Sequence, residues 1–169
     1  MTEYFIQKKY LGRPARTIVK TRDDKSVFLL VGTWGPKGDV LTVYSMEGEF
    51  LAAVKKVPWS FGSRFDLYQG YEKAGTMNKI FSWRFDFYYI AQLGWHVTGN
   101  VFDHQYTIRT FTRPVMTMTT GIDVRGDYYQ LDIPQDNEAP LAICIASVLD
   151  YWVYENQKQK NFNFSPELW

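Results

Sequence analysis

The stretch from Ala139 to Leu149 contains no charged residue, and Asp150 follows it directly. Pro140 is compatible with a helix that starts here, because the first turn of a helix does not use its own N–H groups. A helix on a protein surface carries a polar stripe, whereas this one, which we expect over residues 138–154, is apolar on every side. Its apolar part is also shorter than the ~20 residues that cross a bilayer. We therefore expect a helix that is buried on nearly all sides within its own domain.

Up to about residue 134, apolar and polar residues alternate with a period of two, which is typical of strands that bury one face. Turn signals such as the Gly-Pro-Lys-Gly-Asp run at 35–39 separate these segments, at the spacing of about 8–12 residues that antiparallel sheets show. Val, Ile, Thr, Tyr, Phe and Trp supply 65 of the 169 residues, a composition that favours strands. The pattern predicts about twelve strands. Because no linker rich in Ser, Pro or Gly interrupts it, we expect residues 1–169 to form a single domain.

The strands and the helix constrain each other. A barrel of about twelve strands has a hollow interior unless something fills it, and an apolar helix needs cover on every side. The sequence therefore predicts a mainly β fold, a closed antiparallel barrel around a buried, hydrophobic C-terminal α-helix. Residues 156–169 are predicted to form a polar tail after the helix.

Metal-ligating and redox-active side chains are scarce in this sequence. Cys144 is the one cysteine, which excludes a disulfide framework and a thiolate zinc site, and two histidines cannot form a three-histidine zinc site. Burial within the apolar helix makes the Cys144 thiol unreactive. We therefore expect no metal and no cofactor. The first 22 residues lack the apolar run of a secretory signal, so a cytoplasmic location is expected.

Positive charge is concentrated in the first half of the chain. Residues 1–84 carry 14 basic and 8 acidic residues, a net charge of +6, whereas residues 85–169 carry 5 and 10, a net charge of −5. The densest basic stretch, opposed only by Glu3, consists of Lys8, Lys9, Arg13, Arg16, Lys20 and Arg22. This stretch is a candidate ligand-binding site for an anionic headgroup. The alternative is a hairpin whose basic side chains simply face solvent.

Few residues in the sequence suggest catalysis. Asp103 and His104 can be read as a base oriented by a carboxylate, or as a turn in which Asp103 bonds the local backbone. We favour the turn, because neighbouring residues on a strand point to opposite faces. No other cluster of His, Cys and carboxylates is visible, so we expect a protein that is not an enzyme.

The segment from Trp95 to Ile108 reads Trp-His-Val-Thr-Gly-Asn-Val-Phe-Asp-His-Gln-Tyr-Thr-Ile. It resembles the W-x-V-x-G-x-x-x-D-H-x-Y-x-I signature of the LURP-one-related family, which belongs with the tubby C-terminal-like domains and is similar to the phospholipid scramblases. The stretch 127–133 and the apolar helix that ends near Asp150 match the same family's C-terminal pattern. The resemblance covers nearly the whole chain and implies a closed barrel of twelve strands around a central helix.

The resemblance implies less about function. Tubby proteins bind phosphoinositides through Lys and Arg side chains, but the strand that is often Lys-rich in the family carries no charge here, at 116–120. We expect a non-enzymatic binding or scaffold domain. The alternative is a peripheral membrane module that recognises anionic phospholipid through the basic N-terminal hairpin. The partner expected is thus an anionic phospholipid or a protein. We do not expect specific binding of nucleic acid, and we do not expect the chain to be an integral membrane protein.

Overall fold

The alternating segments form twelve strands in the computed structural model, which describes residues 1–8, 15–33, 40–58, 64–81, 86–124 and 126–163. The first six strands are β1 (Thr2–Gln7), β2 (Ala15–Thr21), β3 (Ser26–Thr33), β4 (Val40–Ser45), β5 (Phe50–Lys56) and β6 (Arg64–Gln69). The second six are β7 (Glu72–Phe81), β8 (Asp86–Ala91), β9 (Trp95–Asn100), β10 (Gln105–Arg109), β11 (Pro114–Asp123) and β12 (Gly126–Ile133). A short 3-10 helix, η1 (Asp136–Glu138), then leads into α1 (Ala139–Asn163).

Every strand pairs antiparallel with its neighbours in the sequence, and β1 pairs with β12 to close the barrel. The closing register runs from Thr2 opposite Ile133 to Gln7 opposite Tyr128. Alternate residues face inward, as along β1, where Tyr4 and Ile6 are buried and their neighbours are not. The predicted fold class, a closed antiparallel barrel of about twelve strands with a C-terminal helix, is confirmed.

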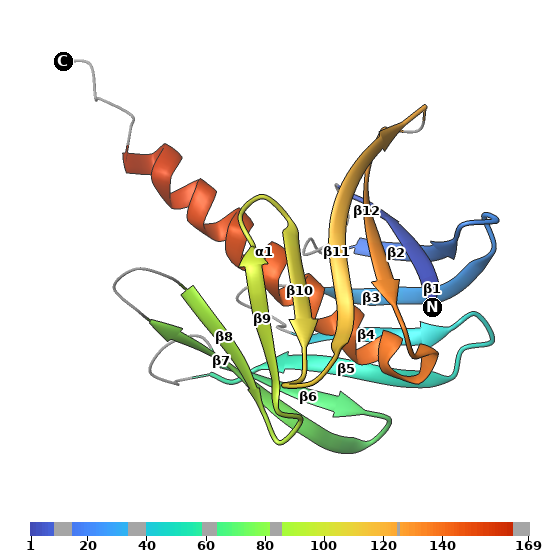
Figure 1. The fold of residues 1–169 in the computed structure, drawn as a ribbon, viewed down its shortest axis with the longest axis horizontal. Helices are drawn as coiled ribbons and strands as arrows, with labels where there is room; N and C mark the ends of the chain where they lie inside the picture. The colour runs from blue at the N-terminus through green and yellow to red at the C-terminus, as the bar shows by residue number, and fades with distance from the viewer. Residues whose placement is uncertain (9–14, 34–39, 59–63, 82–85, 125, 164–169) are drawn as a thin grey trace.

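Helix α1 runs through the barrel and leaves it at one end (Figure 1). Residues 139–149 are all buried, and the helix packs most closely against β4, β5 and β6. Small side chains face the strands at several of these positions, among them the free Cys144 and Ser147, whose hydroxyl donates to the Ile143 carbonyl at 2.9 Å. Burial raises the pKa of the Cys144 thiol, as expected for an unreactive cysteine. No helix in the described part of the chain is long and apolar enough to cross a membrane.

The helix is longer than the sequence predicted. It begins at Ala139 and ends at Asn163, nine residues beyond the predicted end at 154, so most of the predicted polar tail is helical. Residues 155–160 are Glu, Asn, Gln and Lys, and Glu, Gln and Lys favour helix without requiring burial. The apolar pattern therefore predicted the buried part of the helix and not its polar extension.

Polar contacts fix the start of the helix to the barrel. The Arg113 guanidinium donates to both carboxylate oxygens of Glu138, at 2.9 and 2.6 Å. The Tyr4 hydroxyl donates to Asp136 at 3.2 Å. A bidentate pair of this kind is geometrically specific, so it sets the direction in which the chain enters the barrel.

We predict that Ala146→Arg abolishes soluble expression. Ala146 is fully buried, and an unpaired charge there costs several kcal/mol, comparable with a whole domain stability of about 5–15 kcal/mol. Gln157→Arg is the matched control, because Gln157 is exposed on the same helix. Soluble yield and thermal melting measure both variants. An Ala146→Arg protein that melts like the wild type would contradict the buried helix.

Candidate functional site

The six basic residues predicted as a ligand site do not lie together. Lys9 and Arg13 fall outside the described residues. Lys8 lies in the turn that follows β1, whereas Arg16 and Lys20, four residues apart, lie on the outward face of β2. Arg22 follows β2. The structure therefore brings three of the six together, namely Arg16, Lys20 and Arg22.

Two of these three already have partners. Lys20 pairs with Asp24 at 3.0 Å, and Arg22 pairs with Glu3 through its guanidinium. Both pairs are exposed, so they add little stability, but they reduce the positive charge available to a ligand. Arg16 is exposed and has no partner among the described residues.

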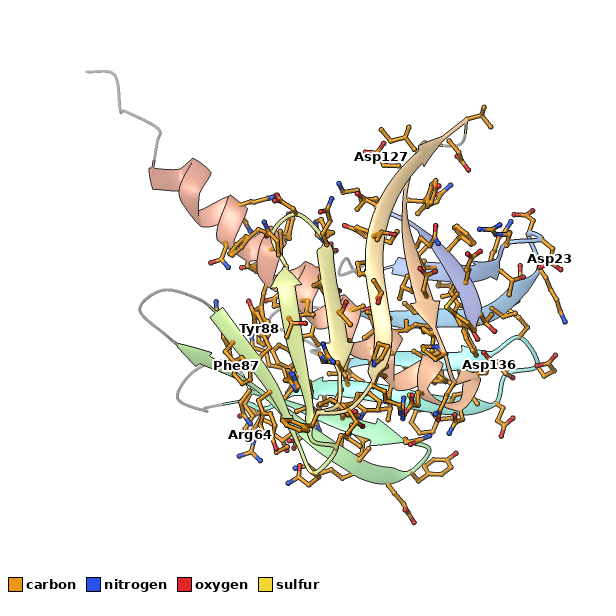
Figure 2. All side chains as sticks on the ribbon, viewed as in Figure 1. Asp23, Arg64, Phe87, Tyr88, Asp127 and Asp136 are labelled. Atoms are coloured by element: carbon orange, nitrogen blue, oxygen red, sulfur yellow. The ribbon has the colours of Figure 1, made fainter. Side chains whose placement is uncertain are left out.

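Arg16, Lys20 and Arg22 border a cavity of about 430 Å³ between β1, β2 and the β11–β12 hairpin, which we call the seam pocket. The opposite wall includes Asp123 and Asp127. Figure 2 shows Asp127 on the projecting part of that hairpin. With Asp24 the described lining carries three basic and three acidic side chains, so an anionic ligand is not favoured by net charge alone.

A second cavity, of about 710 Å³, lies where α1 leaves the barrel, and we call it the rim pocket. Its walls come from the end of β1, the β9–β10 turn, β12 and the outer part of α1. The lining residues include Lys8, His104, Tyr129, Asp150 and Tyr154. The sequence analysis did not predict this site.

Three side chains from distant parts of the sequence meet in this pocket. The Tyr129 hydroxyl donates to Asp150 Oδ1 at 2.6 Å, and its oxygen lies 3.4 Å from His104 Nε2. His104 Nδ1 lies 3.6 Å from the same Asp150 oxygen, just beyond hydrogen-bond distance. Tyr129 and His104 are 2% and 8% exposed. Buried polar groups held in fixed positions are typical of a binding site or of a structural network.

A tight turn places His104 in this cluster. Asn100 donates its side-chain amide to Asp103 at 2.6 Å and accepts the Asp103 backbone N–H at 3.1 Å. His104 itself has a positive φ of 54°. The turn interpretation of Asp103 and His104 is thus confirmed, although the partner of Asp103 is the Asn100 side chain. Gly99 is required before the turn, since its φ is 108° and a Cβ would lie 2.6 Å from the Gln105 carbonyl oxygen.

The environment of His104 keeps its ring neutral. Burial, with a contribution from the nearby Lys8 ammonium, lowers the pKa of His104 to about 4, while Asp103 opposes the shift. At neutral pH the imidazole therefore offers one donor and one acceptor.

A further buried hydroxyl lies near the cluster. Tyr106 is fully buried, and its hydroxyl has no hydrogen-bond partner among the described residues. Burial, followed by the negative charge of Asp150, raises the pKa of Tyr106 well above its usual value. Within the described part of the chain, no three His, Cys, Asp or Glu side chains are arranged to hold a metal ion.

One signal in the sequence could have pointed to this site. Asp150 is the single charge at the end of an apolar helix, and a buried carboxylate needs partners. Tyr129, by contrast, lies on an ordinary alternating strand, and nothing local distinguishes it from the other inward-facing tyrosines. Its role follows only from the position of β12 beside the helix exit.

Residues 2–150 match the family model described as LURP-one-related. This chain belongs to the LURP-one-related family. The domain is 21% identical over 162 residues to the uncharacterized protein YxjI of Bacillus subtilis (strain 168), an alignment that covers 96% of this chain and 100% of that protein. It is also similar to an X-ray structure of a protein from Arabidopsis thaliana, with a TM-score of 0.61 and 10% identity over 88% of this chain and 89% of the plant chain. At that identity the plant structure supports the fold alone.

We predict that His104 makes this LURP-one-related domain less stable in mild acid. Its pKa is lowered in the folded protein, so its contribution is complete above about pH 6.5 and is lost as the pH falls toward 4, because the unfolded chain takes up the proton first. The loss reaches up to about 3 kcal/mol.

Denaturant unfolding of His104→Asn at several pH values tests this, since Asn does not titrate there and tolerates a positive φ. The wild type should lose more stability than this variant between pH 6.5 and 4. His96→Asn, on β9 outside the cluster, should follow the wild type. If the free energy of unfolding changed with pH equally in the wild type and in His104→Asn, His104 would not titrate as described.

Proposed function

We propose that this LURP-one-related domain is a non-enzymatic binding domain and that the rim pocket takes a small polar organic molecule. The observation that carries the proposal is the buried cluster of His104, Tyr129 and Asp150 at the pocket wall. Side chains held in this way present polar groups at fixed positions, which suits recognition of a polar ligand in the pocket.

The chemistry of the pocket suits recognition. Its volume lies within the range usual for small-molecule sites, about 300–1,000 Å³. Phe102 and Tyr154, both more than one-third exposed, supply apolar surface at its edge. The lining that the structure describes contains no serine, threonine or cysteine for His104 to activate as a nucleophile. A neutral imidazole beside a carboxylate therefore favours hydrogen bonding over nucleophilic catalysis.

A thermal-shift screen with sugars, polyols, amino acids, nucleosides and amines tests the proposal. A ligand present at 100 times its dissociation constant stabilises the fold by about 2.7 kcal/mol, which is readily seen as a higher melting temperature. Tyr129→Phe should reduce the shift from any compound found, because it removes the hydroxyl and keeps the ring. Tyr44→Phe, on β4 away from the pocket, is the matched control. The proposal fails if no compound stabilises the wild type, or if Tyr129→Phe and Asp150→Asn both leave the shift unchanged.

A second candidate function is weak binding to anionic membranes. The supporting observation is the β11–β12 hairpin, which projects from the barrel beside the seam pocket (Figure 1). Ile122 on this hairpin is 81% exposed, and Val124 at its tip is fully exposed. Exposed apolar side chains on a hairpin that borders the same pocket as Arg16, a cation without a partner among the described residues, resemble the surfaces that peripheral proteins present to a bilayer. With Lys20 and Arg22 paired, Arg16 contributes an attraction of about 1 kcal/mol, which the carboxylates of Asp123 and Asp127 on the hairpin oppose.

Co-sedimentation with vesicles of phosphatidylcholine, with and without phosphatidylserine, measures this attraction. We expect weak pelleting with the anionic vesicles that falls as salt rises, because screening shortens the range of the charges. Arg16→Glu and the double variant Ile122→Ser/Val124→Ser should each reduce it. Phe111→Ser is the matched control, because Phe111 is 92% exposed between β10 and β11, away from the hairpin tip. Equal pelleting of all variants, or none of the wild type at low salt, would exclude the membrane role.

A further inference from the structure

We propose that the outward face of β4, β5 and β6 is the interface of a weak homodimer, in which a second copy of this chain docks antiparallel on the same face. In the order of strands around the barrel, β5 lies opposite the β11–β12 hairpin (Figure 1). No described residue of these three strands lines the rim pocket or the seam pocket, so the inference is independent of both functions proposed above. An aromatic cluster and a division of charge along the face carry the proposal.

The aromatic cluster lies at one end of this face. The ring centroids of Tyr44 on β4 and Phe50 on β5 are 6.1 Å apart, and the ring of Tyr71, in the turn between β6 and β7, lies 5.2 Å from that of Phe50. Tyr71 is 92% exposed, and Met46 in the β4–β5 turn is 44% exposed. Monomeric proteins seldom expose contiguous apolar surface of this kind, whereas aromatic side chains and methionine are enriched at the centre of interfaces.

The outer face on another side of the barrel is polar. Thr98 on β9, Thr107 on β10 and Thr117 on β11 lie opposite one another in the register, and the Thr107 and Thr117 hydroxyls are 3.3 Å apart. A row of threonines can stay in contact with water, because each hydroxyl bonds to a neighbour or to solvent. The contrast between the two sides indicates β4–β6 as the side that another molecule covers.

The aromatic end of the face is acidic. Glu49 directly precedes Phe50, Glu47 lies in the same turn, and Glu72 directly follows Tyr71. All three carboxylates are exposed, and none forms an ion pair with any residue that the structure describes. A partner that covers the aromatic rings therefore needs positive charge at its edge.

The other end of the same face supplies that charge. Lys55 on β5 lies between Val40 and Asp66 in the register, is exposed, and has no ion-pair partner in the described part of the chain. Arg64 and Lys73 both contact Asp66, at 3.7 and 2.9 Å, so this group keeps one net positive charge. The face thus carries negative charge at its aromatic end and positive charge at its Lys55 end.

A two-fold axis turns this division into complementarity. In a symmetric dimer the same patch is used by both subunits. An axis that passes near Ala53, between the two ends of β5, places Glu49 of each copy opposite Lys55 of the other and brings the Lys55 ammonium close to the aromatic rings. Ala53 pairs with Thr42 on β4, and both side chains are short, so the second copy can approach the middle of the face closely.

The dimensions of the face predict a weak dimer. From Phe50 to Lys55 the strand spans roughly 17 Å at about 3.3 Å per residue, and two strand spacings of about 4.8 Å give a width of roughly 10 Å. This area is smaller than the about 800 Å² that each partner buries in a standard interface. We therefore expect monomer and dimer to exchange, with dimers forming at high micromolar concentrations of the chain.

Sedimentation velocity at low salt, from about 10 µM to about 1 mM protein, tests the proposal over the range of weak affinities. The weight-average mass of the wild type should rise toward twice that of the monomer. Lys55→Glu and Glu49→Lys should each weaken dimerisation roughly tenfold, because each places like charges opposite each other at two symmetric contacts. Tyr71→Ser should weaken it as well. These side chains face solvent in the monomer, so the variants should melt like the wild type.

A mixture of the two charge variants makes the test specific. Lys55→Glu and Glu49→Lys in equal amounts should form a heterodimer as strong as the wild-type dimer, since both contacts then join opposite charges. Lys25→Glu is the matched control, because Lys25 is exposed in the β2–β3 turn away from this face. A wild type that stays monomeric at about 1 mM, charge variants that dimerise like the wild type, or a mixture that stays monomeric would each overturn the proposal.

Discussion

The structure depends on the mutual burial of one apolar helix and twelve strands. Neither is stable alone, because the helix exposes apolar side chains on every face and the barrel without it is hollow. Fully buried small residues such as Ala142 and Ala146 let the strands approach the helix axis, while Trp152 fills a wider part of the interior against Phe65 and Tyr88. The position of the rim pocket follows, since it lies where the helix leaves the barrel.

The rim pocket arises where this apolar interior ends. Asp150 is the first charged residue of the helix, and it meets Tyr129 and His104 at the point where the core gives way to solvent. A carboxylate at this position needs hydrogen-bond donors, and strand β12 supplies one in the Tyr129 hydroxyl. The same burial lowers the pKa of His104.

The sequence predicted those parts of the structure in which burial sets the pattern of apolar and polar residues. Alternation along strands such as β1 and the unbroken apolar run from Ala139 to Leu149 predicted the barrel, the helix and their relation. The helix end at Asn163 was missed because polar residues that favour helix leave no apolar signature. The basic stretch was predicted as one site from spacing alone, yet side-chain partners such as Asp24 and Glu3 depend on how turns and strands pair. Tyr129 could not be predicted, because its role is set by residues 25 positions before and 21 positions after it.

The order of the elements has a consequence for how this domain is made. Thr2 pairs with Ile133, and the helix that forms the centre of the core follows all twelve strands in the sequence. During synthesis on a ribosome, β1 therefore cannot pair with β12 until β12 has been made. The inner face of every strand stays uncovered by the helix until the helix has been made. Long-range pairing of this kind slows folding and prolongs the exposure of apolar strands. Until the helix has been made, hairpins between successive strands are the structure open to the growing chain, and their inner faces stay uncovered.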